Sequence, residues 1–319
     1  AQFEYRDEHL FNARNEINRL AMAFSETINN AQSQGLDLDE LNGRNMFSDI
    51  NTEFLQASRV LPHKTNSGNM EAQINITDVS QVPLDEFDVR YDGSNYIMTN
   101  LSDGLETNLG APGAGTYDTA FGFSFIETSG VANTDDTFRI RLGENSASLM
   151  SLTLTDGKNI AASSAVEANA DDDNIGGGTV NIINVANPEV ARAFTEGVNN
   201  QLTVDVYESA PGTFDYRVYD TGNPPPATVL ASGSFLSGNT AVIDMPPSPT
   251  ASAFQIEITG QPVGQGSLAR EKFSIVDSFG LGNSTNALMT AGSQQSSILS
   301  NNSQTFKQSV AITTATLGS

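Results

Sequence analysis

The sequence contains no cysteine, no tryptophan and only 2 histidines among its 319 residues. Without cysteine it can form no disulfide bond, no thiolate metal site and no cysteine nucleophile. His9 is expected in the first turn of a helix and His63 follows a proline in a loop, so neither lies in a motif that pairs a nucleophile with a base. Two isolated histidines also make no zinc cluster. We therefore expect no enzyme, no catalytic residue, no bound metal and no cofactor.

Basic residues are also scarce. Lys and Arg number 15 against 38 Asp and Glu, which gives a formal net charge of −23 at pH 7. A surface this acidic repels phosphate backbones and anionic membranes, so we expect neither nucleic acid nor a membrane as a partner. No apolar run approaches the roughly 20 residues of a membrane span. The opening stretch AQFEYRDEHLF has neither the basic start nor the apolar core of a signal peptide, and it starts in mid-pattern, as a fragment does.

Apolar residues in the first 34 positions recur at helical spacings, which predicts one helix with a single apolar stripe. The stripe consists of Leu10, Ala13, Ile17, Leu20, Ala21, Phe24, Ile28 and Ala31. Asp7 is expected to cap or charge the first turn. Gly35 is expected to end the helix in a left-handed conformation, which costs glycine less than other residues. A stripe this narrow predicts packing against other helices.

The last 40 residues predict helix again. The pattern runs through Asn286, Ala287, Leu288, Ala291, Ile298, Leu299, Phe306, Val310, Thr313 and Leu317. Ser303 lies three residues before Phe306 and is expected to cap a new turn. Because both chain ends carry apolar stripes, we expect residues 1–51 and 279–319 to pair as one discontinuous helical domain.

Between these ends the apolar period changes from 3.6 to 2, which is typical of strands. The alternating apolar residues are Phe87, Val89, Tyr91, Phe121, Phe123, Phe125, Phe138, Ile140, Leu142, Leu152 and Leu154. The Asp92-Gly93-Ser94-Asn95 stretch between two alternating runs predicts a hairpin, since glycine accepts the positive φ that such turns need. Residues 52–165 are therefore predicted to form an antiparallel β module.

Residues 166–278 repeat this organisation, and the acidic, glycine-rich stretch ANADDDNIGGGTV is expected to link the two modules. Three stretches match in the same order: 87–92 with 214–220, 121–130 with 254–260, and 137–140 with 272–275. We interpret the second region as a duplicate of the first, placed outside it. The expected fold class is α+β, with a discontinuous helical domain from both chain ends that brackets two antiparallel β modules.

The stretch SQGLDLDELNGRNMF, residues 33–47, resembles a calcium loop at first sight. Counted from Asp37, the fifth, sixth and twelfth positions of an EF-hand fall on Leu41, Asn42 and Ser48, which do not fit. The acidic run 171–173 is the other candidate, and such a run is usually just solvated. We interpret residues 33–47 as a corner between helix and sheet, in which Gly43 supports a second turn and Phe47 returns to the core. A calcium-dependent adhesin or carbohydrate-binding surface module stays open as the alternative.

The same stretch and the helix before it resemble the flagellar hook-associated protein 1 family, the first hook–filament junction proteins. The matching residues are Phe3, Arg6, Asn15, Ile17, Leu20, Ala21, Phe24, Asn29, Gly35, Asp37, Gly43 and Phe47. Residues 75–104 resemble the β segment of the family with its central hairpin, and residues 134–142 and 152–165 resemble its closing strands. Near the end, the resemblance continues at Gly282, Asn283, Asn286, Ala287 and Leu288 and through 305–319. The corner argues against another axial protein, such as a flagellin or the second junction protein.

The resemblance implies a structural protein of the bacterial flagellum, extracellular and exported by the type III apparatus without a cleaved signal peptide. It implies a ring of copies that joins hook to filament. The implied partners are the hook protein, the second junction protein, other copies of itself and an export chaperone that binds a terminus outside this sequence, and the fragment alone is expected to be monomeric. The residues expected to hold the structure or its assembly are Leu10, Ile17, Leu20, Phe24, Gly35, Gly43, Phe47, Leu288 and Phe306.

Overall fold

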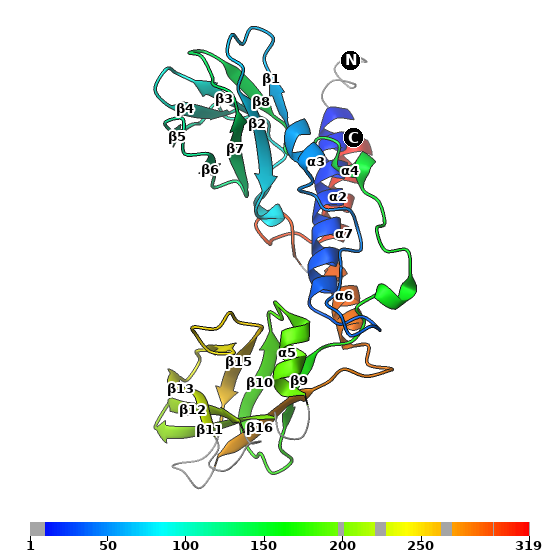
Figure 1. Cartoon of the computed structure of the whole chain (residues 1–319), viewed down its shortest axis with the longest axis vertical. Coiled ribbons are helices and arrows are strands. Elements are labelled where there is room, and N and C mark those ends of the chain that lie inside the picture. The colour runs from blue at the N-terminus through cyan, green and yellow to red at the C-terminus, as the bar shows by residue number, and fades with distance from the viewer. Residues whose placement is uncertain (1–9, 197–200, 221–227, 263–269, 296, 319) are drawn as a thin grey trace. The chain divides into compact units, whose positions relative to one another are not determined.

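The computed structural model describes residues 10–196, 201–220, 228–262, 270–295 and 297–318 (Figure 1). By contact, the chain divides into two compact units. The first unit comprises 1–29, 46–153 and 292–319, and the second comprises 30–45 and 154–291. Each unit combines helices with antiparallel sheets, which confirms the α+β class. The division into three domains that we expect from the sequence stays a prediction.

The predicted N-terminal helix is α2 (Leu10–Ser33), with Asp7 and His9 outside the described residues. The shorter helices are α3 (Glu53–Ser58), α4 (Ser146–Leu149), α5 (Pro188–Thr195), α6 (Thr285–Gly292) and α7 (Phe306–Gly318). Among the helices that the structure describes, none is long and apolar enough to cross a membrane.

The C-terminal helical pattern is interrupted, which corrects the prediction of helix at Ile298 and Leu299. These two residues lie in the connection between η4 (Ser293–Gln295) and α7. The connection contains three successive residues with positive φ, at 300–302. Thr305, rather than Ser303, caps α7. Its hydroxyl accepts the Gln308 N–H at 3.3 Å, and the Gln308 side chain accepts the Thr305 N–H at 2.9 Å, which is a capping box.

The first unit holds a five-stranded and a three-stranded sheet that share one core. The larger sheet has the order β1 (Val60–Pro62), β8 (Thr137–Ile140), β3 (Phe87–Tyr91), β4 (Tyr96–Asn100), β5 (Glu106–Gly110), and the smaller has β2 (Glu71–Ile76), β7 (Phe123–Ser129), β6 (Thr116–Asp118). The predicted hairpin is confirmed: Tyr91 pairs with Tyr96, and Gly93 has φ 97°. The strand expected at Leu152 and Leu154 is wrong, since only an isolated bridge joins Leu152 to Phe47.

The second unit has the same pair of sheets. Its larger sheet has the order β9 (Val166–Ala170), β16 (Glu271–Asp277), β11 (Leu202–Ala210), β12 (Thr213–Asp220), β13 (Thr228–Leu236), and its smaller sheet has β10 (Gly177–Ile183), β15 (Phe254–Gln261), β14 (Ala241–Met245). Each strand of the second unit therefore has a counterpart in the first unit, eight strands earlier in the chain and at the same place in its sheet. This strand order supports the duplication that the sequence indicates.

Two of the three sequence matches join equivalent strands, β7 with β15 and β8 with β16. The third is one strand out of step, because 87–92 lies in β3, whose counterpart is β11, whereas 214–220 lies in β12. Alternating apolar residues mark a strand that is half buried but do not identify which strand it is, so short matches of this kind slip easily.

A half-buried carboxylate accepts several hydrogen bonds at one end of the first β module. The Glu127 carboxylate accepts hydrogen bonds from Tyr96 Oη at 2.6 Å, Tyr117 Oη at 2.9 Å and the Gly113 N–H at 2.9 Å. Burial raises the pKa of Glu127, but these hydrogen bonds lower it more, so its pKa lies below the ordinary value. Burial and the Glu127 carboxylate raise the pKa of Tyr96 well above its usual range.

Glu127→Gln is expected to lower the free energy of unfolding of the first unit by about 1–3 kcal/mol at neutral pH. Because the pKa of Glu127 is lower in the folded than in the unfolded state, its contribution is present above the ordinary value of 4.5 and is lost as the pH falls through the folded pKa. The free energies of unfolding of wild type and variant, measured by urea denaturation, should therefore become equal in acid. A gap that stays constant throughout acidification contradicts this assignment.

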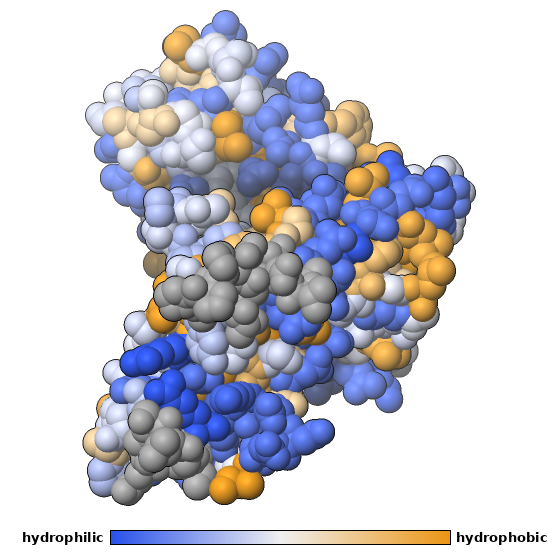
Figure 2. All heavy atoms as spheres, turned by 60° about the horizontal axis from the view of Figure 1, so that its bottom comes forward, coloured by the Kyte–Doolittle hydropathy of each residue, from blue (hydrophilic) through white to orange (hydrophobic). Residues whose placement is uncertain are grey.

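Hydrophilic residues predominate on the face shown in Figure 2, and hydrophobic residues gather there in separate patches. Among the exposed apolar residues of the first unit, Val310 and Ile312 on α7 are 50% and 53% exposed. A single exposed apolar residue is ordinary on a soluble protein, so the acidic net charge stays the dominant property of the surface.

Candidate functional site: the paired helices and the corner loop

Three of the residues singled out from the sequence meet in the first unit. The Phe24 ring on α2 lies 5.4 Å from the Phe47 ring and 5.8 Å from the Phe306 ring at the start of α7, both edge to face. Such aromatic pairs contribute about 0.5–1.5 kcal/mol beyond the burial of their area. Leu20 packs against the same apolar core. The two helices therefore contact each other through aromatic side chains from opposite ends of the chain.

Two other residues do not take part in this contact. Ile17 is 55% exposed, although the stripe predicts that it is buried, and Leu288 on α6 is 68% exposed. Leu10 begins α2, and its side chain lies outside what the structure describes. The assignment of all nine residues to structure or assembly stays a prediction.

Pattern reading missed the polar residues that α2 buries. They are Glu16, Asn18, Arg19, Ser25, Asn29 and Gln32, each less than 8% exposed. Asn29 shows why such residues are tolerated: its amide donates to the Phe47 carbonyl at 3.1 Å and accepts the Phe47 N–H at 2.9 Å. An Asn side chain in this position satisfies both backbone groups of a distant residue.

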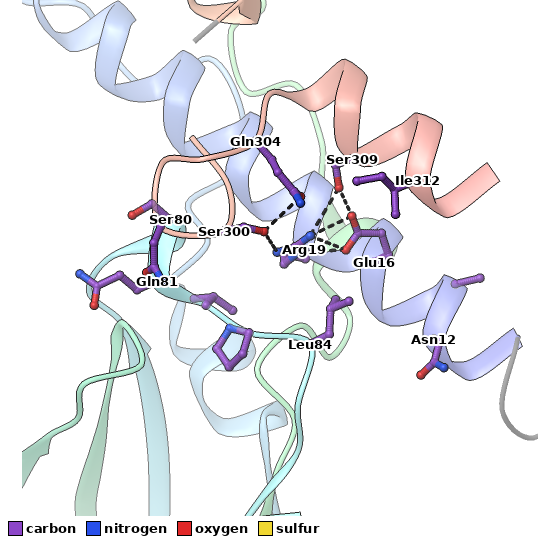
Figure 3. Close-up of a pocket in the computed structure, with 14 residues that line it drawn as sticks. Asn12, Glu16, Arg19, Ser80, Gln81, Leu84, Ser300, Gln304, Ser309 and Ile312 are labelled. Carbon is purple, nitrogen blue, oxygen red and sulfur yellow. Dashed lines mark hydrogen bonds and ion pairs between the residues drawn. The ribbon is translucent and has the colours of Figure 1, made fainter. Parts of the chain in front are cut away.

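A buried ion pair joins α2 to α7 (Figure 3). Arg19 donates through Nε and Nη2 to the two carboxylate oxygens of Glu16, at 2.8 and 2.9 Å. Ser309 of α7 donates to the same carboxylate, and Arg19 Nη1 donates to Ser300 Oγ at 3.2 Å. The pair forms one wall of a cavity of about 450 Å³, which Leu84 and other apolar side chains also line. Because both charges are satisfied, the pair can be buried between the helices.

In the second unit, residues 34–45 form a loop that follows α2, which we call the corner loop. Gly35 lies in this loop, but its φ is not positive, so the expected left-handed conformation is wrong. The reason for glycine is space. A Cβ on Gly35 would lie 2.3 Å from Asn286 Nδ2 and 2.8 Å from the Ala161 carbonyl oxygen. Asn286 itself donates to that carbonyl at 2.7 Å and to the Ala31 carbonyl at 2.9 Å.

Gly43 lies even closer to its neighbours. A Cβ there would lie 1.9 Å from the Gln32 carbonyl oxygen and 2.7 Å from Ala161 Cβ. The Gly43 N–H donates to the Gly35 carbonyl at 3.0 Å, so the two ends of the loop are joined directly. The corner loop can therefore close only with glycine at both positions.

The side-chain contacts of Asp37 show what this residue does in the stretch that resembles a calcium loop. Its Oδ1 accepts the N–H groups of Asp39 and Leu41 at 2.9 and 3.1 Å, and its Oδ2 accepts Asn159 Nδ2 at 3.3 Å. A carboxylate used in this way shapes a turn, and Asp37 is only 1% exposed. Within the described ranges, no group of three or more acidic, His or Cys side chains is arranged to hold a metal ion.

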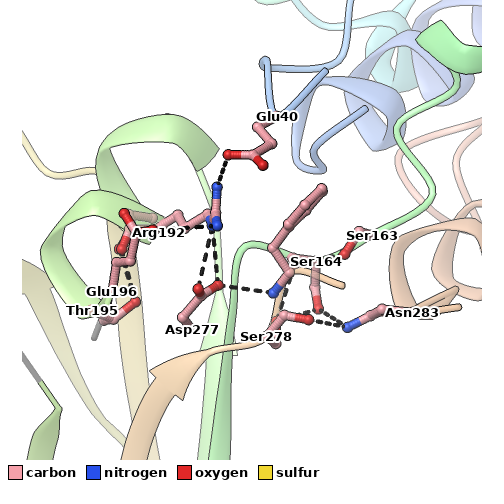
Figure 4. A network of polar contacts seen from close by, with 11 residues as sticks. Glu40, Ser163, Ser164, Arg192, Thr195, Glu196, Asp277, Ser278 and Asn283 are labelled. Carbon is pink, nitrogen blue, oxygen red and sulfur yellow. Dashed lines mark hydrogen bonds and ion pairs between the residues drawn. The ribbon is translucent and has the colours of Figure 1, made fainter. Parts of the chain in front are cut away.

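The corner loop is fixed to the second β module by an arginine (Figure 4). Arg192 on α5 pairs with Glu40 of the loop and with Asp277 at 3.3 Å, and its guanidinium lies 4.6 Å from the centre of the Phe279 ring. Burial lowers the pKa of Arg192, but Glu40 and Asp277 raise it more. The cation therefore stays charged and links loop, helix and strand.

Asn42 makes a second link to α5. Its N–H donates to Glu189 Oε1 at 2.8 Å, and its Oδ1 accepts the Glu189 N–H at 2.8 Å. Its Nδ2 donates to Asn187 Oδ1 at 3.2 Å. Every polar group of the side chain is thus used between the loop and the start of the helix.

Two parts of the chain match models of known protein families. Residues 1–47 match the family model "Flagellar hook-associated protein FlgK helical domain", and residues 62–142 match "Flagellar hook-associated protein 1, D2-like domain". The flagellar hook-associated protein 1 of Escherichia coli is 23% identical over 235 residues, which cover 74% of this chain and 38% of that protein.

Among solved structures, the flagellar hook junction protein FlgK from Burkholderia pseudomallei is similar with a TM-score of 0.67 and 21% identity. The match covers 99% of this chain and 57% of that one, so the two share a fold. FlgL from Xanthomonas campestris is 22% identical over 49% of this chain and 40% of its own, but its TM-score of 0.22 supports no argument.

The present chain spans 38% of the length of the curated relative and 57% of the solved one. Neither these matches nor the turn around Asp37 supports a calcium-dependent adhesin. Both family models, which match separate parts of the chain, come from the same group of proteins, and the curated relative has the same name. Two separate parts of the chain therefore match the flagellar hook-associated protein 1 family.

Proposed function

We propose that the protein containing this chain is a structural component of the bacterial flagellum that assembles itself at the junction between hook and filament. The observation that carries this proposal is the pair of family matches at 1–47 and 62–142. The protein acts outside the cell and is exported by the type III apparatus without a cleaved signal peptide. It has no catalytic role.

The fold suggests how such a component is organised. We propose that the chain-end segments, 1–51 and 279–319, pair as an inner helical domain, with the β modules 52–165 and 166–278 inserted between them. The contacts of Phe24 with Phe306 and of Glu16 with Ser309 support this pairing, because each joins α2 to α7.

The partners proposed are other axial proteins. They are the hook protein, the second junction protein, further copies of this protein in a ring, and an export chaperone that binds a terminus outside this sequence. We propose that the fragment alone is monomeric. The net charge of −23 supports this view, since two copies repel each other unless other contacts bring them together.

The function is tested by complementation. The full gene that contains this sequence is expressed in a strain of its own species whose copy has been deleted, and electron microscopy records whether hooks carry filaments. We expect bare hooks in the deletion strain and filaments after complementation. Filaments of normal number on the deletion strain contradict the proposal.

Phe24→Ala is expected to lower the free energy of unfolding of the first unit by about 2–4 kcal/mol, because it removes an aromatic ring between two others. Ile17→Ala on the same helix is the matched control and should cost less than about 1 kcal/mol, because Ile17 is 55% exposed. Urea denaturation of both variants measures the difference. Equal losses count against the pairing of the chain ends.

A further inference from the structure

The corner loop contains the one Asn-Gly pair in the 319-residue sequence, Asn42-Gly43. An Asn followed by Gly is chemically vulnerable, since glycine has no side chain to hinder its backbone nitrogen and is conformationally free. That nitrogen can attack the Asn Cγ. The side-chain amide then leaves as ammonia, the Gly N–H loses its proton, and a cyclic imide forms. Water opens the imide to aspartate or isoaspartate, so no other reagent is needed.

The fold requires both residues despite this risk. Gly43 is required because a Cβ would lie 1.9 Å from the Gln32 carbonyl oxygen. Asn42 is required because its side chain both accepts from Glu189 at 2.8 Å and donates to Asn187 at 3.2 Å. A carboxylate in its place can accept but cannot donate.

The fold also holds both reacting groups in hydrogen bonds. Gly43 donates its N–H to the Gly35 carbonyl at 3.0 Å, which directs the nitrogen away from attack. The side-chain amide of Asn42 is held at both its oxygen and its nitrogen. Cyclisation requires that these bonds break, and the two that the Asn42 side chain makes break when the corner loop leaves α5.

We propose that Asn42 is a deamidation site gated by the opening of the corner loop, and that its product prevents the loop from closing again. A carboxylate at position 42 lies beside Glu189, whose own carboxylate accepts the Asn42 N–H at 2.8 Å. The two negative charges repel each other, and the hydrogen bond to Asn187 is lost. A transient opening of the corner loop is thereby made irreversible, and the second β module stays released from the loop. This inference is independent of the proposed function.

The gate is tested by incubating the protein in mildly alkaline buffer, with and without urea, and by following the 42–43 peptide by mass spectrometry. Without urea, the deamidation rate should be at least about ten-fold below the rate in urea, because a reaction that occurs only in an open state is limited by the population of that state. Glu189→Ala should react at least about three-fold faster than wild type, whereas Glu167→Ala, on exposed β9, should react as wild type does. Equal rates with and without urea, or no acceleration in Glu189→Ala, overturn the proposal.

The consequence is tested by hydrogen–deuterium exchange. Peptides spanning 36–43 should exchange faster in Asn42→Asp and in deamidated wild type than in fresh wild type, and added salt should reduce the difference. Peptides from the first unit serve as the folding control. If Asn42→Asp disturbs those peptides too, the deamidated wild type decides. Protection of 36–43 that is unchanged in the deamidated protein refutes the release.

Discussion

Arg19→Met is expected to lower the free energy of unfolding of the first unit by about 3–5 kcal/mol. The variant keeps the length of the side chain but removes the cation that satisfies Glu16, a residue only 4% exposed. A buried carboxylate without its counter-charge costs more than the pair contributes when intact. Ser309 still donates a hydrogen bond to Glu16, but it carries no charge. Urea denaturation measures the loss, and exchange of α7 peptides should show that this helix loosens first.

Two further variants separate charge burial from simple loss of an arginine. Arg14→Met, on the same helix, removes a cation that is 57% exposed and pairs with Glu144, so it should cost less than about 1 kcal/mol. The double variant Glu16→Leu with Arg19→Met should recover most of the loss, because it removes both charges together. If the double variant is less stable than Arg19→Met alone, the pair stabilises the helices by itself and this explanation is wrong.

Local chemistry could be predicted from the sequence, and long-range partners could not. The turn at Asp92 and Gly93 depends on residues within four positions, and the structure has it as expected. The burial of the Glu16–Arg19 pair was not predicted, because charged residues are expected at the surface. The partner that allows Glu16 to be buried, Ser309, lies 293 residues away in the sequence. Gly35 was singled out for the wrong reason, since its neighbour Asn286 is equally remote in sequence.

The two β modules also share the place at which each contacts the rest of its unit, and no short sequence motif indicates this place. In each β module, the connection between the second and third strands contacts a segment of its own unit that lies outside both sheets. In the first unit this connection holds η2 (Val79–Gln81), and the Ser80 carbonyl accepts the Asn301 N–H at 2.8 Å. In the second unit it holds α5, which binds Asn42 and Glu40. The duplicated module therefore keeps its point of attachment while the attached segment differs.

The last prediction concerns this second attachment. Gly43→Ala is expected to lower the free energy of unfolding of the second unit by about 3 kcal/mol or more, because its Cβ would lie 1.9 Å from a backbone oxygen that cannot rotate away. The corner loop must shift as a whole, and the Asn42 contacts with α5 shift with it. Exchange of the 36–43 and 188–195 peptides should therefore rise together.

The matched control is Gly157→Ala, in the 3₁₀ turn η3 (Gly157–Asn159) of the same unit, where nothing lies within 4 Å of the added Cβ. This change should stay within about 0.5 kcal/mol of wild type, or stabilise slightly by restricting the unfolded chain. Wild-type stability in Gly43→Ala would mean that the loop can move without cost. In that case α5 holds the loop loosely, and the corner is a flexible joint rather than a fixed one.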